Sequence, residues 1–102
     1  MQRNKVLSYL GLATRAGRVV SGEFCVEKSV RQRRARLVLV SEDASENSRK
    51  NFRNLCTYYK VPLYFFGSRE ELGAACGKAA RVSAAIEEEG LAMAAVREVP
   101  QS

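Results

Sequence analysis

The sequence of 102 residues contains no histidine. Without histidine, neither a Ser-His-Asp triad nor a Cys-His pair can form, so the usual base for activating a nucleophile is missing. The phosphate-loop pattern Gly-x-x-x-x-Gly-Lys-Ser/Thr is absent, and Gly11, Gly17 and Gly22 lack the spacing of a dinucleotide-binding fingerprint. The neighbouring carboxylates Glu87–Glu89 are typical of a solvated turn. We expect a protein that is not an enzyme and needs no cofactor; a catalytic role would require an acidic or thiol pocket.

Cysteine is also scarce. Cys25, Cys56 and Cys76 are separated by 31 and 20 residues, so no Cys-x-x-Cys pair exists to hold a structural zinc ion, and no metal is expected. An odd number of cysteines without a secretory signal predicts reduced thiols, each acting as a small buried apolar side chain.

Long hydrophobic runs are missing as well. No apolar stretch approaches the roughly 18 residues that a membrane span requires. The stretch after Lys5 is interrupted by Ser8, Tyr9 and Gly11, and no small-residue cleavage site follows, unlike in a signal peptide. We therefore expect a cytoplasmic protein that has no membrane partner.

Positive charge, in contrast, is abundant: 17 Lys/Arg stand against 11 Asp/Glu, a net charge of +6. Residues 1–60 contain thirteen Lys/Arg and five Asp/Glu, a net charge of +8, whereas residues 61–102 have a net charge of −2. This asymmetry predicts one basic face that attracts a polyanion such as nucleic acid. The alternative is an ordinary solvated surface.

Hydrophobic spacing predicts alternating helices and strands in a single RNA-binding domain over residues 1–102, with a frayed tail from Pro100. Helices separate the strands, which indicates an α/β fold, a three-layer sandwich with much parallel pairing. The expected elements are a helix capped by Asn4 and ended by Gly17, a strand over Arg18–Ser21, a helix opened by Gly22, a buried strand over Leu37–Val40, a helix introduced by Ser41–Asp43 and broken by Pro62, a strand over Leu63–Phe66, a helix with a Ser68/Glu71 capping box, a strand over Val82–Ile86 and a helix through Leu91–Ala95.

Three stretches could form one binding surface. Arg15–Arg18 places two cations around a glycine, and Gly22 begins a helix whose N–H groups can receive a phosphate. A third stretch clusters arginines at the end of that helix, where they also suit the helix dipole. Tyr58 and Tyr59 are interpreted as helix face and core, so recognition of structured RNA is favoured over threading of single strands.

The segment from Gly22 to Asp43, together with Leu72–Gly77 and the strand to Ile86, resembles the kink-turn-binding ribosomal protein superfamily (ribosomal proteins L-seven-Ae and L-thirty-e). Within it, LGLATRAGRVVSGE and ARLVLVSEDASENSRKNF are similar to the small bacterial YlxQ-type branch. The resemblance covers nearly the whole chain. It implies an α-β-α sandwich around a mixed four-stranded sheet, and binding to ribosomal or regulatory RNA with a sharp bend flanked by sheared G·A pairs.

The family pattern Gly-x-Asn-Glu-x-x-Lys aligns with Gly22 and Lys28 at its ends. The Asn-Glu pair, which in relatives contacts guanine edges, falls on Phe24 and Cys25, which cannot make those hydrogen bonds. The resemblance then predicts weaker discrimination, by roughly 1–3 kcal/mol per lost contact. The second family contact, the loop before the last strand, falls on Gly77–Val82, and the acidic residues closing the central strand match Glu42 and Asp43.

The sequence thus favours a monomeric, ribosome-associated protein that binds structured, kink-turn-like RNA along the helix that begins at Gly22. The alternative is an adaptor that binds ribosomal or RNA-processing proteins through an exposed Phe24. The expected RNA-binding residues are Arg15, Arg18, Gly22, Glu23, Phe24, Lys28, Arg31, Arg33, Arg34, Lys78, Arg81 and Val82.

Overall fold

The computed structural model describes residues 2–100, and side chains from Lys5 onward. Its sheet has the strand order β1-β4-β2-β3. The bounds are β1 Val19–Ser21, β2 Leu37–Val40, β3 Leu63–Phe65 and β4 Ser83–Ile86. β4 pairs antiparallel with both β1 and β2, while β2 and β3 are parallel. The mixed four-stranded sheet is therefore confirmed.

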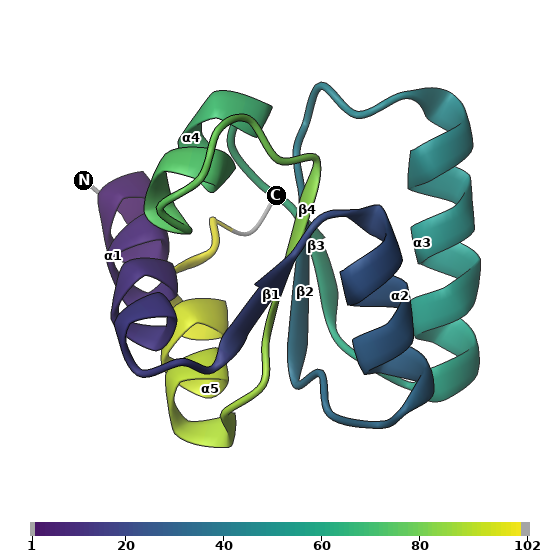
Figure 1. Ribbon diagram of the computed structural model, residues 1–102, viewed down its shortest axis with the longest axis horizontal. Helices are drawn as coiled ribbons and strands as arrows, with labels where there is room; N and C mark the ends of the chain where they lie inside the picture. The colour runs from purple at the N-terminus through teal and green to yellow at the C-terminus, as the bar shows by residue number, and fades with distance from the viewer. Residues whose placement is uncertain (1, 101–102) are drawn as a thin grey trace.

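The expectation of much parallel pairing is wrong. It assumed that each helix between two strands returns the chain to the starting end of the sheet, so that the strands run parallel. Helix α4 (Arg69–Ala75) has seven residues, about 10 Å of helix, and Figure 1 shows it near the end of the sheet where β3 finishes. The chain is not carried back to the start of β3, so β4 begins at that end and runs in the opposite direction.

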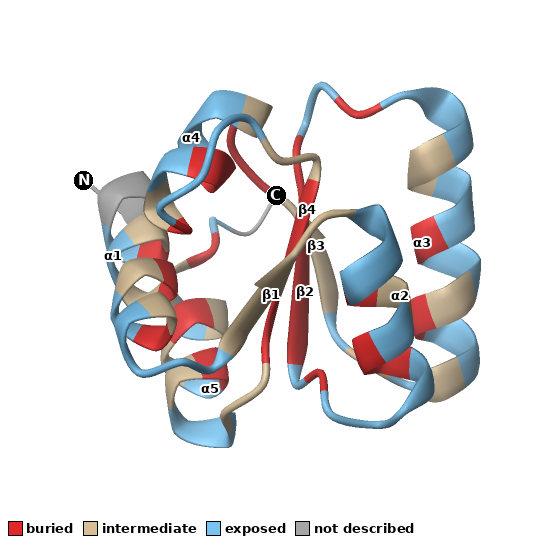
Figure 2. Ribbon diagram, viewed as in Figure 1, coloured by how far each residue is buried: buried red, intermediate tan, exposed pale blue. Residues whose placement is uncertain are grey.

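The helices form a layer on each side of the sheet (Figure 1). Helices α1 (Gln2–Arg15), α4 and α5 (Glu89–Glu98) cover one face, and α2 (Glu23–Arg31) and α3 (Glu46–Tyr59) cover the other. Alternate residues of β2 pack into the two cores: Leu37 and Leu39 toward α1, Val38 and Val40 toward α2. The prediction of a strand buried on both faces is thus confirmed, and Figure 2 shows the buried centre of the sheet.

Local signals set most helix starts. The Ser68/Glu71 capping box is present: the Glu71 N–H donates to Ser68 Oγ at 3.0 Å, and the Ser68 N–H to Glu71 Oε1 at 2.9 Å. Helix α3 begins later than expected, because Ser45 Oγ accepts the Ser48 N–H at 3.1 Å. The predicted cap at Asn4 is wrong, since α1 already includes that residue.

The predicted solvated turn at Glu87–Glu89 is also wrong. The Glu87 carboxylate accepts a hydrogen bond of 2.6 Å from the Ser29 hydroxyl and lies 3.9 Å from Arg34. Glu88 caps α5, accepting the N–H groups of Leu91 and Gly90 at 2.6 and 3.0 Å, and these bonds lower the pKa of its carboxyl. Both carboxylates hold the fold together where the sheet meets α2 and α5.

No helix within residues 2–100 is long and apolar enough to cross a membrane. The frayed tail expected from Pro100 concerns residues 101–102, which lie outside the described residues.

Gly73 of α4 provides a stability test. A Cβ at this position would stand 1.9 Å from the Ala79 carbonyl oxygen, so Gly73→Ala must push the Gly77–Val82 loop away. We expect a loss of about 1–3 kcal/mol in the free energy of unfolding. The matched control is Gly11→Ala in α1, where the nearest atom is an ordinary 3.9 Å away and a gain of about 0.5–1 kcal/mol is expected. Urea denaturation of the two variants checks both signs, and equal stabilities would contradict the packing.

Candidate nucleic-acid interface

Two loops meet where β1 ends. Gly22, with φ 92°, turns the chain into α2, and its N–H donates to the Ser83 carbonyl at 3.0 Å. The Ser41 N–H donates to the Val82 carbonyl at 2.8 Å, which joins the loop after β2 to the same point. We call the region formed by Gly22, Ser41–Asp43 and Gly77–Val82 the Gly22 end of the sheet. It unites the family's two expected contact segments.

The start of α2 is open to solvent. Its N-cap residue is Gly22, so within the described residues no side chain caps its first turn. Glu23 lies in that turn, where its charge suits the helix dipole, and its carboxylate accepts the Ser48 hydroxyl of α3 at 3.0 Å. Glu23 therefore ties α2 to α3, and the exposed N–H groups beside it are available to an anion.

One face of α2 is exposed and mixed in character. Phe24, Lys28 and Arg31 stand at helical spacings of four and three residues and line one shallow hollow with Glu27 and Gln32. The Phe24 ring is 76% exposed. The face offers two cations for phosphate and one aromatic surface.

The loop from Gly77 to Val82 lies beside this helix start. Lys78 is exposed, whereas Arg81 is half-buried, with its guanidinium donating to the Ala80 carbonyl at 3.0 Å and its N–H to the Arg69 carbonyl at 2.9 Å. Val82 packs against the core under α2 and α3. Lys78 is thus the loop cation best placed to meet a partner, and Arg81 shapes the loop.

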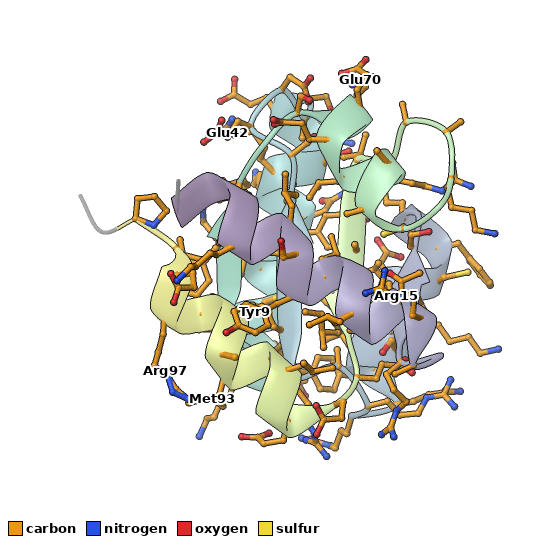
Figure 3. The ribbon with its side chains drawn as sticks, turned by 90° about the vertical axis from the view of Figure 1, so that its left-hand side faces the viewer. Tyr9, Arg15, Glu42, Glu70, Met93 and Arg97 are labelled. Atoms are coloured by element: carbon orange, nitrogen blue, oxygen red, sulfur yellow. The ribbon has the colours of Figure 1, made fainter. Side chains whose placement is uncertain are left out.

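The remaining predicted cations do not join this site. Arg18 precedes β1 and Gly22 follows it, so the two are about four strand residues, or roughly 13 Å, apart. Arg15, Arg18, Arg33 and Arg34 lie at the other end of the sheet or beside it; Figure 3 shows Arg15 at the end of α1, away from Glu42. The expectation of a single surface from all three basic stretches is therefore wrong, because β1 separates Arg15–Arg18 from the start of α2.

That opposite region, formed by Arg18, Arg34–Arg36 and Glu87, we call the Glu87 end. The Arg18 guanidinium donates to the Glu87 carbonyl at 3.3 Å, and the Glu87 carboxylate lies 3.9 Å from Arg34. Arg36 lies 3.8 Å from Glu89. Part of the basic charge read from the sequence is thus used in contacts within the fold.

Sequence reasoning placed Tyr59 in the core and Tyr58 on the helix face, and it did not count Tyr58 among the binding residues. Tyr58 is 77% exposed and lines a hollow between α2 and α3 with Asn51, Asn54 and Arg31. The sequence signal that predicts its exposure to solvent is its position around the helix axis. Phe52 and Cys56 are buried and four residues apart, and Tyr58 lies about 200° from Cys56 around the helix axis.

Comparison with known proteins gives the fold a family. Residues 4–95 match the model of the Ribosomal protein L7Ae/L30e/S12e/Gadd45 family. The chain belongs to this family. The match includes the Gly22 end and most of the helices on both faces of the sheet.

Proteins with similar sequences support this family membership. The chain is 52% identical over 83 residues to "RNA-binding protein YlxQ" of Bacillus subtilis, covering 81% of this chain and 83% of that protein. It is 31% identical over 81 residues to the large ribosomal subunit protein eL30 of Candida albicans, covering 78% of this chain and 76% of that protein. The family recognised from sequence motifs, and its YlxQ-type branch, are confirmed.

Solved structures share the fold. A Bacillus halodurans protein described as having unknown function superposes with a TM-score of 0.88 at 35% identity, over 92% of this chain and 95% of that one. The Giardia lamblia 15.5kD RNA binding protein superposes with a TM-score of 0.83 at 22% identity, over 95% of this chain and 83% of that one. The second likeness concerns the fold alone.

The three cysteines differ in a way that can be measured. Cys56 and Cys76 are buried as predicted, and burial raises the pKa of Cys76 and raises that of Cys56 to about 11. Cys25, predicted to be buried, is exposed on the first turn of α2. Because the thiolate is the reactive form, we expect iodoacetamide at pH 8 to modify Cys25 alone in the folded protein, and all three after denaturation. Mass spectrometry counts the adducts; rapid modification of Cys56 in the folded protein would contradict the structure.

Proposed function

We propose that the chain is a non-catalytic RNA-binding protein that docks structured RNA at the Gly22 end. The observation that carries this proposal is the hydrogen bond of 3.0 Å from the Gly22 N–H to Ser83, which brings the start of α2 beside the Lys78–Val82 loop. A bent RNA can be held between such a helix start and a loop. The name of the Bacillus subtilis relative, an RNA-binding protein, supports the assignment.

In this proposal phosphates, rather than base edges, supply most of the binding energy. Lys28 and Arg31 contact the backbone along α2, while Gly22 has no side chain to keep the RNA away from the helix N–H groups. Lys78 adds a third cation from the loop, and Arg81 and Val82 fix the shape of that loop. Arg15, Arg18, Arg33 and Arg34 act on an RNA at this end only through long-range attraction.

Kink-turn recognition and association with the cytoplasmic ribosome are the finer parts of the proposal. The ribosomal relative eL30 supports the second. For the first, the exposed positions of Phe24 and Cys25 are the ones from which family members would reach sheared G·A pairs. An apolar ring and a thiol cannot make the hydrogen bonds to those pairs. The feature that the protein recognises is then the bend of the RNA itself, held between the helix and the loop.

A second candidate is an adaptor for a protein of translation or RNA processing. Phe24 is 76% exposed at the rim of a hollow, and an aromatic anchor in such a place is typical of a protein contact. The surrounding Lys28 and Arg31 favour an acidic partner and suit RNA at least as well.

Removing the charge of Lys28 tests the proposed RNA site. We expect Lys28→Gln to weaken binding to kink-turn RNA several-fold and to lower the salt slope of binding by about 1, since one phosphate contact is lost. Filter binding at several salt concentrations measures both quantities. The control Arg97→Gln removes the same charge from exposed α5 and should change neither by more than a small amount.

A straightened RNA with the same composition serves as the second probe. Tighter binding to the bent RNA supports kink-turn recognition. Equal, weak affinity for both RNAs would remove that part and leave general RNA binding. An unchanged affinity in Lys28→Gln would reject the site.

Restoring the polar pair tests the cause of the expected low specificity. We expect Phe24→Asn with Cys25→Glu to improve discrimination between bent and straightened RNA, by roughly 1–3 kcal/mol per contact regained. Both positions are exposed, so the fold should tolerate the change. Loss of a nuclease-resistant protein complex in the same variant, with no change in RNA affinity, would instead favour the adaptor.

A further inference from the structure

Three surface hollows lie next to one another along α2 and α3, and neighbouring hollows share lining residues. The hollow beneath Phe24 and Lys28 shares Glu27 and Arg31 with the hollow between α2 and α3. That second hollow shares Tyr59 with a third, which Arg33, Arg36 and Lys60 border. The groove, which we call the α2–α3 groove, follows the two helices that run side by side in Figure 1. Its first hollow begins at Phe24, two residues after Gly22.

The middle of the groove has the chemistry of a base-binding surface. The Tyr58 ring is 77% exposed and rests edge-on against Tyr59, with ring centroids 4.9 Å apart and planes at 76°. Asn51 and Asn54 from the same helix line this stretch with amide donors and acceptors. A ring fixed by its neighbour, with one face open beside amides, can stack on and hydrogen-bond to an unpaired base.

The far end of the groove gathers cations at two unusual backbone positions. Arg33 has φ 61° and Lys60 has φ 60°, and between residues 2 and 100 these are the two non-glycine residues with positive φ. Glycine or asparagine is the usual residue where a helix ends in this conformation, and a longer side chain there is strained. Lys28 and Arg31 already place positive charge in the last turn of α2, so the dipole of α2 alone does not explain Arg33. Helix α3 has no basic residue in its last turn, so Lys60 also suits the dipole of α3.

Charge favours a polyanion as the occupant. Lys28, Arg31, Arg33, Arg36 and Lys60 line the groove against two acids, Glu27 and Glu89. Arg36 lies 3.8 Å from Glu89, and the Arg33 guanidinium lies over the Tyr59 ring, 5.3 Å from its centroid. The net excess of cations is spread along the groove, as phosphates are along a strand.

We propose that the α2–α3 groove binds an unpaired RNA strand that leaves the structured RNA docked at the Gly22 end, stacking a base on Tyr58 and placing phosphates against Arg33 and Lys60. This inference rests on the proposed function. The nine residues of α2 span about 13 Å, the length of roughly four stacked nucleotides. An extension of four to six nucleotides is therefore long enough to reach Arg33 and Lys60 at the far end of the groove.

The test compares kink-turn RNA that ends at its stems with the same RNA carrying six unpaired uridines at either end. We expect the better-placed extension to raise affinity about tenfold, with a salt slope steeper by about 1.4 from two added phosphate contacts. The variant Arg33→Asn with Lys60→Asn should lose this gain, and its affinity for the unextended RNA should fall no further than in a control variant that also loses two charges, since both lose the same long-range attraction. Asparagine accepts the left-handed conformation, so the melting temperature of the asparagine variant should equal or exceed that of the unchanged protein.

The matched control, Lys5→Gln with Arg97→Gln, removes two charges from the α1 and α5 layer and should retain the full gain. Three results would overturn the inference: no gain from either extension, equal losses in the two double variants, or the same gain from a base-paired extension. A chain that fails to bind even the unextended RNA would reject the proposed function itself. If oligouridine alone were then bound and lost in the asparagine variant, the groove would remain a strand-binding site.

Crosslinking provides an independent readout. With 4-thiouridine in the extension, irradiation should attach the RNA to a peptide containing Tyr58, and Tyr58→Ala should abolish both the crosslink and part of the affinity gain. A crosslink confined to α1 or α5 would contradict the proposed path of the strand.

Discussion

Strand β4 pairs along both of its edges, antiparallel to β1 on one side and to β2 on the other. Its residues Ser83–Ile86 are buried on both faces, and the first three have small side chains that let two helix layers close over the sheet. Because β4 begins where β1 ends, Gly22 meets the loop that ends at Val82. Because β4 ends where β1 begins, the Glu87 carbonyl meets Arg18. The contacts at the Gly22 end and at the Glu87 end both depend on the position of β4 between β1 and β2.

The position of β4 between β1 and β2 also explains why basic side chains are paired within the fold at one end of the sheet and exposed at the other. At the Glu87 end, the half-buried Glu87 carboxylate accepts the Ser29 hydroxyl and lies near Arg34, so an acid from the C-terminal half offsets cations of the N-terminal half. On α3, the Arg49 guanidinium lies 4.7 Å from the Phe65 ring centroid and donates to the Glu42 carbonyl at 3.0 Å. Lys28 and Arg31 of α2 remain exposed and line the hollow beside Phe24, so that helix presents positive charge to solvent.

Signals that act over a few residues predicted the fold well. The Ser68/Glu71 capping box and the apolar run Leu37–Val40 are local, and both have the predicted structure. The partner of Glu87 could not be predicted, because Ser29 lies 58 residues away and meets it only once β4 stands between β1 and β2. For the candidate site, spacing identified Gly22 and Lys28, yet the separation of Arg18 from Gly22 required the length and direction of β1.

The sequence could not show that the hollows lined by Phe24 and Tyr58 lie next to each other, because the packing of α2 against α3 decides this, and it alters how RNA recognition is understood. Phe24 and Tyr58 are both more than three-quarters exposed, and the α2–α3 groove connects the hollows that they line. In the proposed function, the Gly22 end lacks the polar pair that would read base edges, so hydrogen bonds there would discriminate poorly between sequences. A stacking ring and the amides of Asn51 and Asn54 lie instead farther along the same face. In the proposed function, recognition is then divided: the helix start and loop would select a bent shape, and the groove would select an unpaired strand beside it.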